Sequence, residues 1–141
     1  MTGFLTDAQR QTFAALADVL IPEAEGMPAA SQVDLQGAPL DLVLELRPDL
    51  HEALFRALDR AAGEDAAEVL QQLNRDDHPA IGALGAVASA AYYMQPEVWR
   101  RLGYPGQTSR PAAPEEENDY MHDDLLKPVI DRGSICRKAP Q

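Results

Sequence analysis

The segment from Ala80 to Met94 constrains the fold more than any other part of this sequence. Its centre, residues 81–91, reads Ile-Gly-Ala-Leu-Gly-Ala-Val-Ala-Ser-Ala-Ala and is almost entirely apolar. A helix without a polar face is buried on several sides. Gly82 and Gly85 each cost about 1 kcal/mol relative to alanine inside a helix, so we expect close packing by neighbouring helices to compensate. The segment therefore predicts a helix at the centre of a bundle.

The residues before this segment contain further helical patterns. Thr6 and Gln9 have the spacing of a capping box, and apolar residues then recur at helical spacing up to Leu20. A loop rich in proline, glycine and small residues follows from Pro22 to Pro39. Further helices are expected over 40–46, 48–62, 65–74, 80–94 and 96–102. Because no strand-like alternation appears, the sequence predicts an all-α fold, a small bundle of about five helices over 6–102.

Aromatic residues gather directly after the central segment. Residues 92–106 hold the only tryptophan and three of the four tyrosines. Pro96 and Gly103 are suited to the first turn and the end of a short helix, and Tyr104-Pro105-Gly106 is typical of a turn. We expect Tyr92 to close the bundle. Trp99 and Tyr104 flank the turn and are the better candidates for contact with a partner, because large aromatic side chains anchor interfaces.

The remaining residues differ in kind, so we divide the chain into a helical bundle domain, 1–106, and a tail, 107–141. The tail contains four prolines and the acidic run Glu-Glu-Glu-Asn-Asp at 115–119, which do not build a core. It also carries spaced apolar residues, among them Tyr120 and Leu126. A mostly extended, proline-rich arm that docks on the bundle or on a partner accounts for both properties, and the sequence leaves these two alternatives open.

The charge of the chain excludes several classes of function. Its formal net charge is −11, which argues against binding to nucleic acid or to an anionic lipid surface. No run approaches the roughly 20 apolar residues that span a bilayer, so no direct membrane insertion is expected. Residues 1–7 lack the basic start and apolar core of a signal peptide. We therefore expect a cytoplasmic protein, or a periplasmic one if the export signal lies on a partner or was removed.

No motif for catalysis or cofactor binding is apparent. The chain has no glycine-rich nucleotide loop, no nucleophile elbow and no haem-attachment motif. His51 is expected to be a surface residue, and Cys136, the single cysteine, a bystander. His122 lies among Asp119, Asp123 and Asp124, and a metal-dependent enzyme that uses this region is one alternative. The preferred expectation is a chain with no catalytic residue, no metal site and no cofactor of its own.

Three motifs resemble the gluconate 2-dehydrogenase subunit 3 family. The first is the Tyr-Tyr, Pro-Glu-Val-Trp and Leu-Gly-Tyr-Pro-Gly run within 92–106. The second is Leu5-Thr6 followed by Leu-Ala-Asp-Val-Leu-Ile-Pro at 16–22 and Met-Pro-Ala-Ala at 27–30. The third is Leu-Lys-Pro-Val-Ile-Asp-Arg-Gly at 126–133. Many members of that family begin with a twin-arginine export signal, from which this sequence departs.

The resemblance implies a non-catalytic small subunit. Its partner would be the large FAD-dependent subunit, of the glucose-methanol-choline type, of a sugar or polyol dehydrogenase, which this chain would stabilise and help to mature or escort. Such complexes usually pass electrons to a separate cytochrome. A stand-alone helical protein-interaction module is the alternative without redox chemistry. The residues expected to bind the partner are Tyr93, Trp99, Leu102, Tyr104, Pro105, Gly106, Tyr120 and Leu126.

Overall fold

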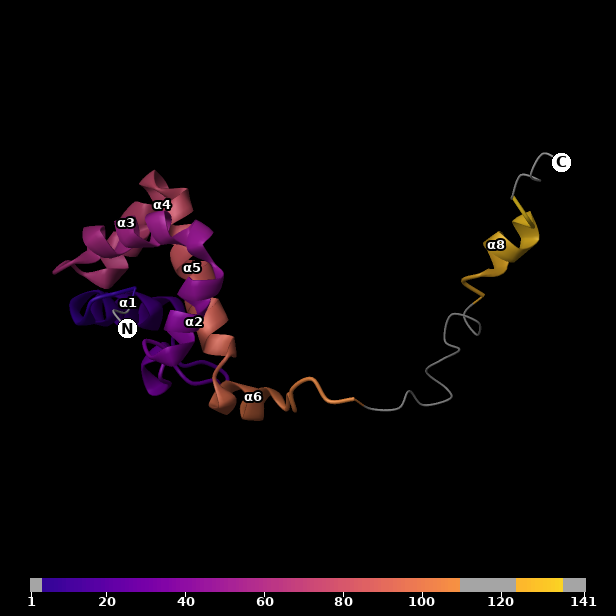
Figure 1. The fold of residues 1–141 in the computed structure, drawn as a ribbon, viewed down its shortest axis with the longest axis horizontal. Helices are drawn as coiled ribbons and strands as arrows, with labels where there is room; N and C mark the ends of the chain where they lie inside the picture. Colours follow the sequence, from indigo (N-terminus) through magenta and orange to yellow (C-terminus); the bar gives the residue numbers. More distant parts are fainter. Residues whose placement is uncertain (1–3, 110–123, 136–141) are drawn as a thin grey trace. The chain divides into compact units, whose positions relative to one another are not determined.

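The fold is all-α over the residues that the computed structural model describes, which are 4–109 and 124–135 (Figure 1). Within these ranges the only β-type pairing is an isolated bridge between Ala24 and Met27. The helices are α1 (Asp7–Leu20), α2 (Ala38–Leu46), α3 (His51–Ala61), α4 (Ala66–Asp76), α5 (His78–Tyr93), α6 (Pro96–Leu102) and α8 (Lys127–Arg132), with short 3-10 turns η1 (Ala30–Gln32) and η2 (Pro48–Leu50). None of these helices is long and apolar enough to cross a membrane.

Helix α1 begins at the predicted capping box. The backbone N–H of Gln9 donates to the Thr6 hydroxyl, and the Gln9 side chain accepts from the Thr6 backbone N–H at 3.0 Å. These bonds satisfy backbone donors that have no partner inside the helix. Phe13, Leu16 and Ala17 then face the core. The start of α1 and most of its buried face follow the prediction, but Leu20 at the end of the helix is exposed by 36%.

Helix α5 lies at the centre of residues 1–106, as predicted, and packs against α1, α2, α3, α4 and α6 (Figure 1). Its buried side chains recur three or four residues apart, and Leu84 and Val87 are completely inaccessible to solvent. These residues join the other helices in a single hydrophobic core. The buried face of α5 therefore links the helices that form the bundle.

The prediction that close packing surrounds Gly82 and Gly85 is wrong. Gly82 is exposed and Gly85 half-buried, and a methyl group at either position would meet no atom within 4 Å. Ala86, Ser89 and Ala90 are exposed or nearly so on the same outer side of the helix. Alanine and glycine count as apolar, but they carry so little apolar area that leaving them in water costs little. One face of α5 is therefore open to solvent.

Some predicted boundaries also shift. Helix α2 begins at Ala38, because Pro39 fits the first turn, so the loop that was predicted to end at Pro39 is slightly shorter. The helix predicted from residue 48 divides into η2 and α3. Helix α4 continues to Asp76 through residues that were predicted to form a polar turn. His51 is half-buried, because its ring lies between Phe4 and Phe55 and its Nε2 is 2.7 Å from the Leu44 carbonyl oxygen.

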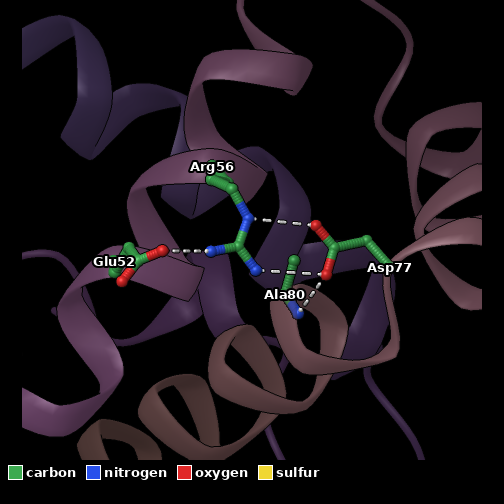
Figure 2. A network of polar contacts seen from close by, with 4 residues as sticks. All are labelled: Glu52, Arg56, Asp77 and Ala80. Carbon is green, nitrogen blue, oxygen red and sulfur yellow. Dashed lines mark hydrogen bonds and ion pairs between the residues drawn. The ribbon is translucent and has the colours of Figure 1, made fainter.

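A polar network joins α3 to the start of α5 (Figure 2). The guanidinium of Arg56 donates to both carboxylate oxygens of Asp77, at 3.2 and 3.3 Å, and to Glu52 at 3.1 Å. Asp77 is also the N-cap of α5, since its carboxylate accepts the Ala80 backbone N–H at 3.1 Å. The hydrogen bonds from Arg56 and then from Ala80 lower the pKa of Asp77 below its usual value of 3.8. One carboxylate therefore both caps the central helix and fixes its start against α3.

Replacing Asp77 with alanine is expected to lower the urea midpoint of unfolding at neutral pH. Because the pKa of Asp77 is lowered in the folded state, its contribution is fully present above its usual pKa and is lost as the pH falls through the lower folded value. The difference in midpoint between wild type and Asp77→Ala should therefore be constant above about pH 5 and narrow below about pH 4.

The neighbouring substitution Asp76→Ala is the control for this experiment. Asp76 makes only an exposed ion pair with Arg60, at 3.3 Å, and pairs of this kind contribute little to stability. We expect its urea midpoint to stay close to that of the wild type. If the difference in urea midpoint between wild type and Asp77→Ala stayed the same below about pH 4, it would contradict the role assigned to the Asp77 carboxylate.

The structure divides after Gly106 into two units, residues 1–106 and 107–141. In the described part of the second unit, α8 covers Lys127–Arg132 and ends at Gly133, which has a φ of 71°. The sequence predicts a mostly extended arm over 107–141, and the presence of α8 differs from that prediction. Pro128 occupies the first turn of α8, where proline is compatible with a helix.

Candidate functional site

Four large side chains form an exposed surface around α6, which we call the aromatic patch: Tyr93, Trp99, Leu102 and Tyr104. Their exposed fractions are 57%, 36%, 54% and 46%. The patch includes the only tryptophan of the chain. Aromatic side chains of this kind are enriched at the centres of protein interfaces, where they lose few rotamers on binding. Of the exposed surfaces on residues 4–106, this one is the strongest candidate for binding a partner.

Local sequence fixes the shape of the patch. Pro96 opens α6, and Gly103 ends it in the left-handed conformation with a φ of 66°. The left-handed conformation of Gly103 turns the chain back, so that the Tyr104 backbone N–H donates to the Trp99 carbonyl at 2.9 Å. The Tyr104 ring then meets the Trp99 ring edge to face, with 5.7 Å between ring centroids. The glycine therefore brings together two aromatic residues that are five positions apart in the sequence.

Two hydrogen bonds from side chains further hold the patch on the bundle. The Trp99 indole N–H donates to the backbone carbonyl of Tyr93, and the buried Tyr92 hydroxyl donates to the Pro28 carbonyl at 2.7 Å. Tyr92 itself is only 4% exposed, which confirms its predicted place in the core. Tyr93 is exposed although it follows Tyr92 directly, because adjacent residues of a helix point about 100° apart.

Hydrogen bonds from two side chains that sequence reasoning missed hold the loop between α1 and α2 next to α6. Gln95, the one buried polar residue of the described chain, donates from Nε2 to the Asp34 carbonyl at 2.8 Å. Arg101 donates from Nη1 to the Gly26 carbonyl at 2.6 Å. These contacts span 61 and 75 positions in the sequence, so no local pattern indicates them. Together they make the loop and α6 one continuous surface.

A small charge cluster on α6 borders this surface. Glu97 accepts a hydrogen bond from Arg101 at 2.9 Å and pairs with Arg100 as well. The hydrogen bond from Arg101, followed by the charge of Arg100, lowers the pKa of Glu97. Beside the cluster is a shallow, open depression of about 640 Å³, lined in part by Glu23, Gln32, Asp34, Glu97, Arg100 and Arg101. A polar border beside an apolar centre is the usual composition of a protein interface.

The other residues predicted to bind a partner fall into three places. Pro105 and Gly106 follow Tyr104 in the described chain as irregular backbone, so the turn predicted over 104–106 is not formed there. Leu126 lies just before α8, in the second unit. Tyr120 lies outside the described residues. The predicted residues of 92–106 therefore lie on the first unit, and Leu126 lies on the second.

The residues considered for catalysis or metal binding lie mostly outside the described part of the chain. His122 and Cys136 lie outside the described residues. Within 4–109 and 124–135, no group of three His, Cys, Asp or Glu side chains is arranged to hold a metal ion. The geometry of the described surface is suited to contact with a macromolecule, through an ordered apolar centre and a polar border. No protein-family model, no curated protein and no solved structure matches this chain.

Proposed function

We propose that this chain is a non-catalytic small subunit of an FAD-dependent sugar or polyol dehydrogenase. It binds the large flavoprotein subunit, of the glucose-methanol-choline type, stabilises it and helps it to mature. The observation that carries the proposal is the exposed aromatic patch. The residues that form this patch belong to the first of the three motifs that resemble the gluconate 2-dehydrogenase subunit 3 family. Three of the four aromatic residues in that motif, Tyr93, Trp99 and Tyr104, are exposed, which favours a role in contact over a role in the core.

The physical state of the patch supports tight binding. Trp99 is held by its indole hydrogen bond and by its contact with Tyr104. The loop beside it is held by Arg101. Groups that are ordered before binding lose less conformational entropy when the complex forms, so more of the contact energy appears as affinity. Burial of the four patch side chains then supplies the main apolar contribution.

A stand-alone interaction module is the second candidate, favoured by the same patch without the family resemblance. Such a module would use the aromatic surface to bind a protein unrelated to flavin chemistry. The two candidates differ in what the chain does to a flavoprotein. Only the accessory subunit should change the yield and flavin content of a dehydrogenase subunit.

The test is co-expression of the tagged chain with a large FAD-dependent dehydrogenase subunit from the same organism. We expect a stable complex that shows the visible absorption of bound flavin, and a lower yield of flavin-loaded large subunit when the chain is omitted. The chain purified alone should be colourless. A large subunit that reaches full flavin content and activity without the chain, and does not bind it, would refute the proposal.

A further inference from the structure

The depression beside α6 contains a buried amide whose hydrogen bonding is incomplete. Gln95 lines this depression together with Glu23 and Asp34. The Gln95 side chain is almost wholly removed from water, since the residue is only 7% exposed. A polar group buried to this extent costs free energy unless it forms hydrogen bonds. The partners of its two amide atoms therefore indicate what the depression can bind.

The orientation of the Gln95 amide is fixed by two backbone carbonyls. Its Nε2 lies 2.8 Å from the Asp34 carbonyl oxygen and 3.5 Å from the Ala91 carbonyl oxygen. Both neighbours are acceptors, so the amide nitrogen, which donates, must be the atom that faces them. No donor from residues 4–106 contacts Oε1, and this oxygen keeps some access to solvent, because no fully buried side-chain oxygen of the described chain lacks a partner. Gln95 therefore offers a free acceptor atom.

Two carboxylates that line the same depression also have free acceptor atoms. Glu23 accepts a hydrogen bond from Gln32 through Oε2 at 2.6 Å, and nothing in residues 4–106 donates to its Oε1. Asp34 accepts the Gln95 bond through its backbone carbonyl, and within the same range its carboxylate accepts no bond and forms no ion pair. The depression thus brings together two negative charges and the amide oxygen of Gln95.

The positive charges at the depression are already balanced in part. Arg101 donates to Glu97 at 2.9 Å and to the Gly26 carbonyl at 2.6 Å, and Arg100 pairs with Glu97. Neither arginine forms an ion pair with Glu23 or Asp34. The surrounding unit is acidic as well, because residues 1–106 contain sixteen Asp and Glu, seven Arg and no Lys, a net charge of −9. These charges favour a positively charged ligand.

We propose that the depression receives an arginine side chain of the large flavoprotein subunit. This inference rests on the proposed function and names the chemistry of one partner group next to the aromatic patch. A guanidinium has five N–H donors in a planar fork and no acceptor, so it can donate to a carboxylate and to an amide oxygen at the same time. Arginine is also enriched at the centres of protein interfaces.

The first test uses the full chain without the large subunit. N-acetyl-arginine amide is titrated into the ¹⁵N-labelled chain, with the uncharged N-acetyl-norleucine amide as the control probe. We expect the arginine probe to shift the amide resonances of Glu23, Asp34 and Gln95, including the Gln95 side-chain amide, and the control probe not to shift them. The variant Glu23→Gln with Asp34→Asn should lose most of this response, because it removes both charges at nearly constant shape.

The second test measures the Kd of the same variant for the purified large subunit. Glu45→Gln with Asp59→Asn is the matched control, since it makes the same change of charge at two exposed positions that do not line the depression. We expect Glu23→Gln with Asp34→Asn to raise Kd at least about tenfold, as loss of charge-assisted hydrogen bonds does, and to reduce its dependence on salt. The control should change Kd far less.

Several results would overturn this inference. An unchanged Kd for the depression variant would remove this site from the interface while leaving the proposed function intact. Equal increases of Kd for the two pairs would reduce the effect to long-range charge. Equal shifts with N-acetyl-lysine amide would contradict the assignment to arginine. Failure of the wild-type chain to bind the large subunit would refute the proposed function, and the partner assigned to the depression with it, whereas the arginine titration tests the chemistry of the depression by itself.

Discussion

Leu84→Ala is expected to lower the free energy of unfolding by about 2–5 kcal/mol, which is the usual cost of this truncation in a core. Leu84 is completely buried on α5, the helix against which five others pack. Truncation of the Leu84 side chain leaves a cavity that the surrounding helices close only in part. Because small domains have a total stability of about 5–15 kcal/mol, the variant should unfold at a much lower urea concentration. Urea titration followed by far-UV circular dichroism measures the difference.

Leu46→Ala provides the matched control, since the chemical change is the same and only the environment differs. Leu46 ends α2 and is 67% exposed. Surface substitutions usually change stability by no more than about 0.5 kcal/mol. Equal losses for the two variants would contradict the assignment of α5 to the centre of the core.

Much of the fold could be predicted, because its helices have strong local signals. The capping box at Thr6 marks where α1 begins, and the prolines at 22 and 48 follow the ends of α1 and α2. The spacing of leucines indicates which faces the helices bury. The environment of Gly82 and Gly85 could not be predicted in the same way. Glycine and alanine are compatible with both close packing and exposure, so an apolar composition without large side chains does not specify which face is buried.

Part of the candidate site was also predictable. Side-chain type singled out the aromatic residues, and helical spacing explains why Tyr92 points inward while Tyr93 is exposed. The contacts that hold the surface in place were not predictable. Arg101 reaches Gly26, and Gln95 reaches Asp34, across 75 and 61 positions, so these pairs depend on the tertiary arrangement of α6 and the loop.

The double substitution Trp99→Ala with Tyr104→Ala is expected to weaken binding of the proposed large flavoprotein subunit strongly. Truncation of a large aromatic residue at the centre of an interface costs about 2 kcal/mol or more, which is roughly a 30-fold increase in Kd. Trp99 and Tyr104 are exposed by 36% and 46%, and neither belongs to the hydrophobic core of the bundle. We therefore expect the variant to keep its helical spectrum and to melt close to the wild type.

Two further variants make the interpretation specific. Tyr93→Ser with Leu102→Ser removes exposed patch side chains but keeps the Trp99 indole and its acceptor, the backbone carbonyl of Tyr93. It should weaken binding without altering the edge-to-face contact of Trp99 and Tyr104. Phe4→Ala removes an aromatic side chain outside the patch that is 47% exposed. It should leave the Kd for the large subunit unchanged.

The role of the aromatic patch in binding is tested by the Kd of Trp99→Ala with Tyr104→Ala for the purified large subunit, measured by titration calorimetry beside a thermal melt of the same sample. We predict a Kd raised by roughly 30-fold or more at a nearly unchanged melting temperature. An unchanged Kd would exclude the aromatic patch from the interface. A melting temperature far below that of the wild type would assign Trp99 and Tyr104 to the core of the bundle.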